Sequence, residues 1–150
     1  MTNMIQNMNF MKKGFTLVEL LVVISIIGLL IGLSIFGLSG ARETSRDAKR
    51  KADLEQIRGG LEIYKSDCND YPASLSTSLS GDGTPVTCAA ANTYISSVPA
   101  DPLTPERGYS YTRPTATTYI LCAALEQVPS PAVTGCASCT VACNYKVTNP

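Results

Sequence analysis

One uninterrupted apolar run near the start of the sequence constrains the fold most. It reads FTLVELLVVISIIGLLIGLSIFGLS at residues 15–39, and Glu19 is its only charged residue. About 20 consecutive apolar residues in a helix cross the hydrocarbon core of a bilayer, so the run is long enough to span a membrane. A cleaved secretory signal has a shorter apolar stretch, of about 7–15 residues. Ser39, Gly40 and Ala41 would suit signal cleavage, but the length of the run and its carboxylate favour a retained anchor.

Six cysteines follow the apolar run, at Cys68, Cys88, Cys122, Cys136, Cys139 and Cys143. An even number of cysteines in a small, turn-rich region is typical of a disulfide-stapled domain in an oxidising compartment. We expect Cys68 to pair with Cys88, because each lies in turn-rich sequence with no other cysteine near, and the remaining pairing stays open. Cys136, Cys139 and Cys143, completed by Cys122, would also suit zinc, but disulfides are favoured outside the cytoplasm.

The composition argues against catalysis and against nucleic-acid binding. The 150 residues include 12 acidic and 12 basic side chains, so no excess of positive charge indicates a nucleic-acid partner. Histidine, the commonest acid–base catalyst and metal ligand, is absent from the sequence. We therefore expect a protein that is not an enzyme, with no catalytic residues, no cofactor and no specific nucleic-acid site.

The charges that flank the apolar run do not set its orientation by the positive-inside rule. Lys12 and Lys13 precede the run, but a larger basic group follows it, at Arg42, Arg46, Lys49, Arg50 and Lys51. Disulfides form outside the cytoplasm, so the cysteines place the C-terminal side there. The sequence thus predicts a single-pass protein of the inner membrane with its head outside the cytoplasm.

The apolar run is predicted to continue into one long helix. No proline occurs between Met1 and Tyr71, and a helix of about 50 residues would be roughly 75 Å long. Beyond residue 40 an amphipathic stripe indicates a face that packs on the head, with a bend expected at Gly59 and Gly60. The stripe consists of Ala41, Ala48, Leu54, Ile57, Leu61 and Tyr64.

The head is predicted to be a small antiparallel sheet. Residues 109–112 and 118–125 are β-prone and flank Arg-Pro-Thr-Ala-Thr, which favours a hairpin, and residues 141–147 would add a third strand. Alternation places Tyr119, Leu121, Ala123 and Leu125 on one face, expected to pack on the helix. The predicted fold class is therefore α+β: a long N-terminal helix, membrane-spanning in its first half, packed on a small disulfide-stapled antiparallel head.

The string KKGFTLVEL at residues 12–20 resembles the prepilin processing site of type IV pilins and type II secretion pseudopilins. The segments around Val98, Gly108 and Tyr119 are similar to the heads of the same proteins. The resemblance implies four regions: a cleaved leader at 1–14, a membrane and filament-core helix at 15–40, its amphipathic continuation at 41–66, and a globular head at 67–150. It also implies cleavage by a prepilin peptidase after Gly14 and methylation of the new Phe15 amine. Glu19 would then neutralise the amine of an adjacent subunit in a low-dielectric core.

The resemblance also raises a calcium site, because in type II pseudopilins the loop near the aspartate that Asp101 resembles binds calcium. Calcium takes about six to eight oxygen ligands, usually with several carboxylates. Only Asp101 and Glu106 are available in this segment. We therefore expect no metal site, with Asp101 as the candidate ligand if one exists, and cysteines stapling the loop instead.

The function implied by the resemblance is structural. The chain would be a subunit that leaves the lipid of the inner membrane and polymerises with itself into a type IV pilus, for adhesion, motility or DNA uptake. Pilus or secretion assembly machinery would be its other partner. A pseudopilin of a type II secretion system is the first alternative, and a secreted or membrane-anchored cysteine-rich binding module is the second.

Overall fold

The computed structural model describes residues 14–127 and 133–150. It divides into two units, Met1–Ser39 and Gly40–Pro150, and one helix, α1 (Leu17–Cys68), has residues in both. Within the described residues, five strands follow α1 along the chain: β1 (Leu79–Ser80), β2 (Thr93–Ile95), β3 (Ser110–Thr115), β4 (Thr118–Ala123) and β5 (Tyr145–Thr148). The predicted α+β class is confirmed. Residues 1–13 of the expected leader lie outside the described residues.

In the first unit, the N-terminal part of α1 is apolar and exposed. The segment Leu17–Ile35 is long and apolar enough to cross a membrane, and none of it is buried inside the structure. Its hydroxyl groups are satisfied within the helix, since Ser25 and Ser34 donate hydrogen bonds to the carbonyls of Leu21 and Leu30. A helix whose polar groups are all satisfied internally suits a lipid environment.

In the second unit, α1 buries one stripe of residues spaced three and four apart. The stripe is Asp47, Arg50, Leu54, Ile57, Leu61, Tyr64 and Cys68. The sequence prediction was correct from Leu54 onward but wrong at Ala41 and Ala48, which are exposed. Two charged residues hold the buried positions instead, because this part of the head presents ionic groups to the helix.

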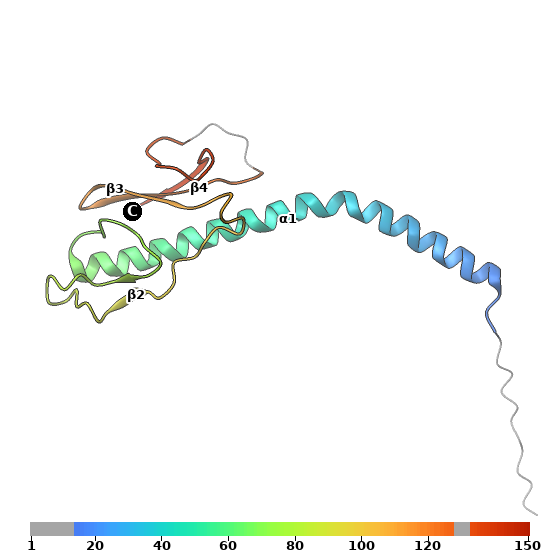
Figure 1. Ribbon diagram of the computed structural model, residues 1–150, viewed down its shortest axis with the longest axis horizontal. Coiled ribbons are helices and arrows are strands. Elements are labelled where there is room, and N and C mark those ends of the chain that lie inside the picture. Colours follow the sequence, from blue (N-terminus) through green and yellow to red (C-terminus); the bar gives the residue numbers. More distant parts are fainter. Residues whose placement is uncertain (1–13, 128–132) are drawn as a thin grey trace, which may run out of the picture. The chain divides into compact units, whose positions relative to one another are not determined.

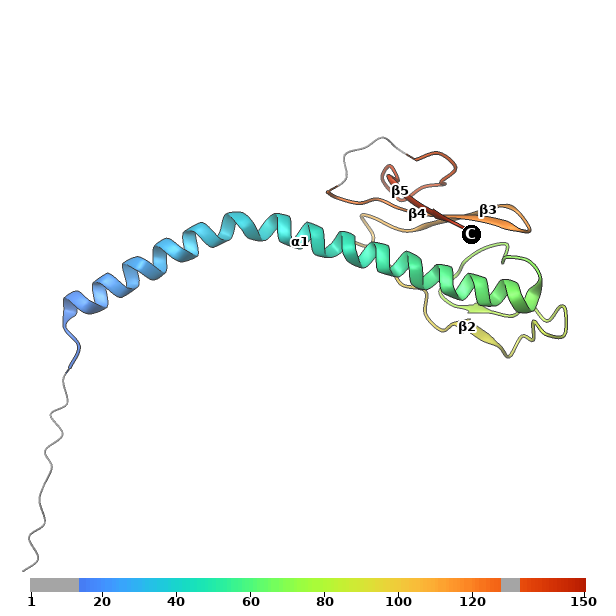
Figure 2. The same ribbon diagram turned by 180° about the vertical axis from the view of Figure 1, so that it is seen from behind.

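Two antiparallel sheets make up the rest of the second unit. β3, β4 and β5 form a three-stranded sheet in that order, and β1 pairs with β2. Figures 1 and 2 show the larger sheet and β2 on different sides of α1. The predicted hairpin is confirmed, and a third strand is present but begins at Tyr145 rather than Val141. β3 continues through Pro114 to Thr115, and Thr115 pairs with Thr118 across a shorter turn than predicted. Proline is accepted here because β3 is an edge strand, where a missing N–H need not break a ladder.

β4, the central strand, is buried on both of its faces. Tyr119, Leu121 and Ala123 pack with Leu54, Ile57 and Leu61 of α1 in the main core, as predicted for this face. The opposite face was not predicted to be covered. There Cys122 and the following Ala124 form a second small core with Cys139 and Cys143, so the cysteine-rich segment serves as a covering layer.

Three disulfides join the six cysteines, and no free thiol remains. Cys68 pairs with Cys88, the pair expected from the sequence, and ties the end of α1 to the segment between β1 and β2. Cys122–Cys136 and Cys139–Cys143 both lie in or beside the connection from β4 to β5. A head with so little apolar surface to bury is expected to need such staples.

α1 passes through Gly59 and Gly60 without interruption, and only the second glycine is packed. A Cβ on Gly60 would lie 2.3 Å from Cγ1 of Ile95 in β2, whereas a Cβ on Gly59 would have nothing within 4 Å. Gly60 therefore permits the close approach of β2 to the helix.

This difference predicts opposite effects for the same substitution at neighbouring positions. Gly59→Ala should stabilise the protein by about 1 kcal/mol through helix propensity. Gly60→Ala should destabilise it, because overlap with the buried Ile95 costs about 1–3 kcal/mol and exceeds that gain. Thermal unfolding of the full chain in detergent measures both. Equal effects of the two variants would contradict the proposed contact between Gly60 and β2.

Candidate functional site

The first candidate site is the start of α1, where Thr16 and Glu19 form a reciprocal cap. The Thr16 N–H and hydroxyl each donate to Glu19 Oε2 at 2.8 Å, and the Glu19 N–H donates to Thr16 Oγ1 at 3.2 Å. This is the capping box, in which the residue before the helix and the one three positions later satisfy each other's backbone donors. The Thr-x-x-Glu spacing is visible in the sequence, but Thr16 was not among the residues predicted to have a role.

The cap holds the Glu19 carboxylate near the beginning of the helix. Phe15, the residue before Thr16, is 93% exposed, and a Cβ on Gly14 would meet nothing within 4 Å. None of the ion pairs in residues 14–127 and 133–150 includes Glu19. The structure thus brings Glu19 close to Thr16, with hydrogen bonds rather than an opposite charge as its partners.

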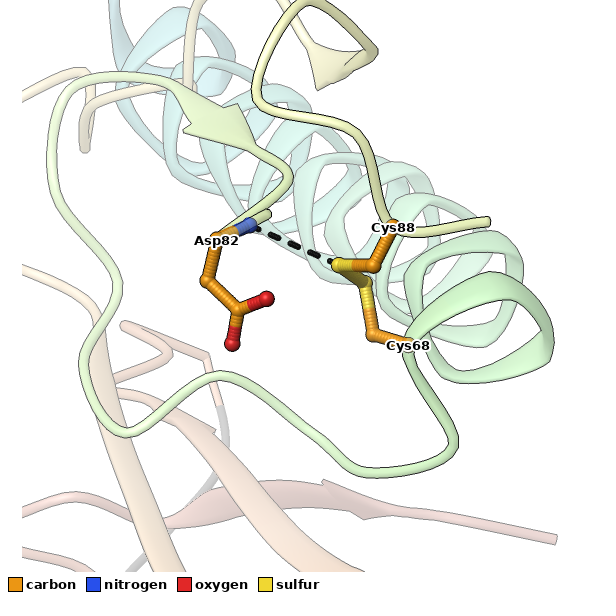
Figure 3. A group of neighbouring side chains, drawn as sticks. All are labelled: Cys68, Asp82 and Cys88. Atoms are coloured by element: carbon orange, nitrogen blue, oxygen red, sulfur yellow. Dashed lines mark hydrogen bonds between the residues drawn. A yellow bond between two sulfur atoms is a disulfide. The ribbon is translucent and has the colours of Figure 1, made fainter. Parts of the chain in front are cut away.

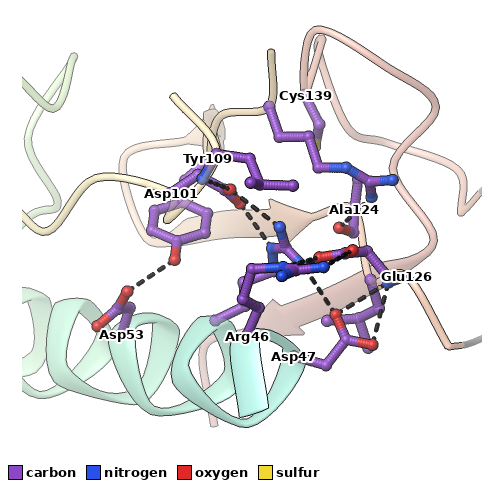
Figure 4. Close-up of polar contacts among 12 residues, drawn as sticks. Arg46, Asp47, Asp53, Asp101, Tyr109, Ala124, Glu126 and Cys139 are labelled. Carbon is purple, nitrogen blue, oxygen red and sulfur yellow. Dashed lines mark hydrogen bonds and ion pairs between the residues drawn. The ribbon is translucent and has the colours of Figure 1, made fainter. Parts of the chain in front are cut away.

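The second candidate site is an ionic cluster in the second unit, centred on Arg50; Figure 4 labels its members Arg46, Asp47, Asp101 and Glu126. Arg50 is fully buried. Its Nε and Nη2 donate to the two carboxylate oxygens of Asp101 at 2.7 and 3.0 Å. Its Nη1 donates to Asp47 at 2.7 Å and to Glu126 at 2.6 Å. One guanidinium group from α1 therefore binds three carboxylates, two of which come from the head.

Neighbouring donors complete the hydrogen bonding of these carboxylates. Arg46 makes a two-pronged ion pair with Glu126, and the Leu103 N–H donates to Asp101 at 2.8 Å. Asp47 also accepts from the backbone N–H groups that follow β4, those of Glu126 and Gln127. Buried charges are tolerated when they are paired and hydrogen-bonded in this way.

The cluster shifts the ionisation of its members. The hydrogen bond from Arg46 lowers the pKa of Glu126 to about 2, against the opposing effect of burial and with further help from Arg50. Burial raises the pKa of Asp101, but hydrogen bonds from Arg50 and from the Leu103 amide outweigh it and lower the pKa overall. The hydrogen bonds to Asp101 also raise the pKa of Arg50, against its own burial. All three groups are therefore held in their charged forms.

The four cysteines that the sequence offered for zinc are joined in two disulfides, Cys122–Cys136 and Cys139–Cys143. Glu106 is exposed, whereas the Asp101 carboxylate is bound by Arg50. Cys68, Cys88 and Asp82 have ligand atoms within 4.8 Å of one another, but Figure 3 shows the two sulfurs joined as a disulfide, with the Asp82 N–H donating to Cys88. Cysteines in disulfides lack the thiolates that bind zinc.

Three tyrosines of the head make further polar contacts with α1. Tyr109 donates to Asp53 at 2.7 Å, and Tyr71 and Tyr119 both donate to Glu62. Burial, followed by the hydrogen bond to Glu62, raises the pKa of Tyr71 to about 12. These contacts link acidic residues of the helix to the head without ion pairs.

The cluster predicts a specific pH dependence of stability. The pKa of Glu126 is lowered from 4.5 to about 2, and that of Asp101 is lowered from 3.8, so the folded state binds fewer protons than the unfolded state. The resulting stability is present above pH about 4.5 and is lost as the pH falls towards about 2. Thermal unfolding of the full chain in detergent between pH 7 and pH 2 should show this loss. Glu126→Gln should be less stable at neutral pH and lose less on acidification; a decline as steep as that of the wild type would contradict the assignment.

Two family models match this chain, one at the start of α1 and one over the rest of α1 and most of the head. The prokaryotic N-terminal methylation motif matches residues 9–38, which include the capped start of α1. The family model described as type II secretion system (T2SS), protein G matches residues 38–124, more than half of the chain. No solved structure shows a significant match.

Curated relatives carry names of two kinds. The type II secretion system core protein G of Escherichia coli is 35% identical over 96 residues, which cover 61% of this chain and 66% of that protein. The core protein G of Klebsiella pneumoniae is 40% identical over 63 residues, covering 42% and 45% of the two chains. The type IV wide pilus major component PilA4 of Thermus thermophilus is 37% identical over 90 residues, covering 55% and 69%. The matches span less than two thirds of the core G proteins themselves. The methylation motif leads directly into the region that the protein G model matches, and that region is more than half of the chain. The chain therefore belongs to the protein G family of type II secretion systems.

Proposed function

We propose that this chain is the structural subunit of a helical filament that is assembled from the inner membrane. The observation that supports this best is α1 itself. In the first unit, the apolar side chains of Leu17–Ile35 are exposed in the single subunit. In the second unit, α1 packs against a folded head. Such a helix needs lipid before assembly, and the helices of other subunits afterwards.

Two filaments suit such a subunit, and the relatives support each. The type IV pilus, our first interpretation from the sequence, is supported by the likeness to PilA4. The pseudopilus of a type II secretion system is supported by the protein G family model and by the core G relatives. The processing at Phe15 and the role of Glu19 that we propose are the same for both filaments.

The proposed processing site is the peptide bond between Gly14 and Phe15. A prepilin peptidase would cut there and the Phe15 amine would be methylated, which agrees with the N-terminal methylation motif matched at residues 9–38. The exposure of Phe15 and the open space beside Gly14 support access by a peptidase. In the proposed topology the leader lies in the cytoplasm and the disulfide-bonded head lies outside.

Glu19 is the proposed assembly residue. After cleavage, the amine of Phe15 carries a positive charge into an apolar filament core, where an unpaired charge costs several kcal/mol. The capping box keeps the Glu19 carboxylate at the start of the helix through Thr16, and the subunit supplies no cation to pair with it among the described residues. We propose that the Phe15 amine of an incoming subunit is this cation.

The competing function is a secreted or anchored binding module whose first residues serve only as a signal or a tether. Intact mass of the mature protein separates it from the proposal. The proposal expects a protein that begins at Phe15 with one added methyl group. An N-terminus at Arg42, or an uncleaved chain starting at Met1, would overturn the filament proposal.

The role of Glu19 is tested by variants that separate its charge from its capping. Glu19→Gln keeps an oxygen that can accept from Thr16 but removes the charge, and glutamine also completes capping boxes. Thr16→Ala removes the capping hydroxyl, at a cost of about 1 kcal/mol in helix stability, but keeps the charge. We expect Glu19→Gln and Glu19→Ala to insert into the membrane and fail to assemble, whereas Thr16→Ala assembles.

The measurement is the ratio of sheared filament to membrane-bound subunit at equal expression. Normal filament from Glu19→Gln together with reduced filament from Thr16→Ala would show that Glu19 acts only as a helix cap. As a control, the Glu19→Gln and Glu19→Ala subunits that accumulate in the membrane should carry a methylated Phe15. This would confirm that processing is intact and that the variants are blocked at the assembly step.

A further inference from the structure

The Arg50 cluster bears on the calcium site that the family resemblance implies near Asp101. We propose that Arg50 provides the cation that neutralises Asp101 and connects the head to α1, so that the head folds and remains stable without calcium. The inference rests on the second unit alone. It holds for a pilus subunit, a pseudopilus subunit or a tethered module.

Both carboxylate oxygens of Asp101 are already bound by a cation. Both oxygens accept from Arg50, and one of them also accepts from the Leu103 N–H. Calcium binds oxygen at about 2.3–2.6 Å and repels a neighbouring guanidinium, so it cannot share these oxygens with Arg50. Binding of calcium at Asp101 would require Arg50 to leave a position in which it is fully buried.

The other oxygens of the cluster are committed as well. Glu126 is held by Arg46 and Arg50, and Asp47 is held by Arg50 and by the backbone N–H groups that follow β4. Within the described residues, the one group of three carboxylate or cysteine side chains close enough to share a metal is the disulfide-bonded pair with Asp82. In the part of the head that the structure describes, no cluster of several free carboxylates is therefore gathered of the kind that calcium requires.

The guanidinium connects separate segments of the chain, as a bound metal ion would. It joins α1 to the loop at Asp101 and to the segment that follows β4 at Glu126, which are separated by 51 and 76 residues from Arg50 in sequence. Beyond Glu126, the chain is closed covalently by Cys122–Cys136 and Cys139–Cys143. The ionic cluster and the disulfides together hold the region of the head around Asp101, which a bound calcium ion would otherwise hold.

The direct test is thermal unfolding of the full chain in detergent, with its disulfides intact, in excess EDTA and in roughly millimolar calcium. Because a ligand stabilises the fold that binds it, the proposal expects the same Tm in both solutions and no stoichiometric heat of calcium binding by calorimetry. A Tm that rises with calcium, together with saturable binding that Asp101→Asn abolishes, would overturn it.

Variants of Arg50 test whether the guanidinium is the cation in question. Arg50→Gln removes the cationic partner of the buried Asp47 and Asp101 carboxylates and one of the two cations that bind Glu126, and it should lower the Tm by roughly 10 °C. Adding Asp101→Asn to this variant should recover part of the loss, because it removes one of the stranded charges. Arg58→Gln is the matched control on the same helix, since Arg58 pairs with Glu55 at 3.5 Å on the surface, and its Tm should be nearly that of the wild type. An Arg50→Gln protein as stable as this control would contradict the proposal, and if the variant fails to fold, the calcium experiment on the wild type still decides it.

Discussion

The second unit depends on one stripe of α1, because both sheets of the head pack against the helix along it. The chemical character of the side chains in this stripe changes along the helix. It is ionic at Asp47 and Arg50, aliphatic at Leu54, Ile57 and Leu61, and ends in Tyr64 and a disulfide at Cys68. Each part receives a matching part of the head: carboxylates, the inner face of β4, and the segment between β1 and β2. Different chemistry at each end of the stripe fixes the register of the helix against the head.

The head compensates for its small size by making β4 serve two cores. A three-stranded sheet with one apolar face would bury little surface, and small domains of this kind are marginal. Here the second face of β4 is covered by the cysteine-rich connection to β5. Cys122 belongs to this second core and is also bonded to Cys136, so the covering segment is fixed by a covalent bond as well as by contact.

Much of this architecture follows from local sequence patterns. The absence of proline predicts the long helix, alternation predicts the inner face of β4, and isolated cysteines predict the Cys68–Cys88 bond. The Arg50 cluster has no such pattern, because its partners lie 51 and 76 residues away and charged residues are ordinarily exposed. For the same reason Ala41 and Ala48 were wrongly assigned to the buried stripe. β1 and β2 were too short, at two and three residues, to show any alternation. Thr16 is different, because its capping pattern was present and only its role went unassigned.

Pro114 in β3 matters when many copies of the head are crowded together. In a filament of the proposed kind, identical heads would be held next to one another at very high local concentration, and each three-stranded sheet would bring two free edges. An open edge is a template for pairing with the same strand of a neighbour, which leads to aggregation rather than to an ordered fibre. Pro114 removes one donor from the edge of β3, and the shift of register between Thr112 and Thr115 bends the same strand. The tip of the hairpin is thereby made a poor partner for another copy of itself, and in the proposed filament the contacts between subunits would fall to surfaces other than backbone ladders.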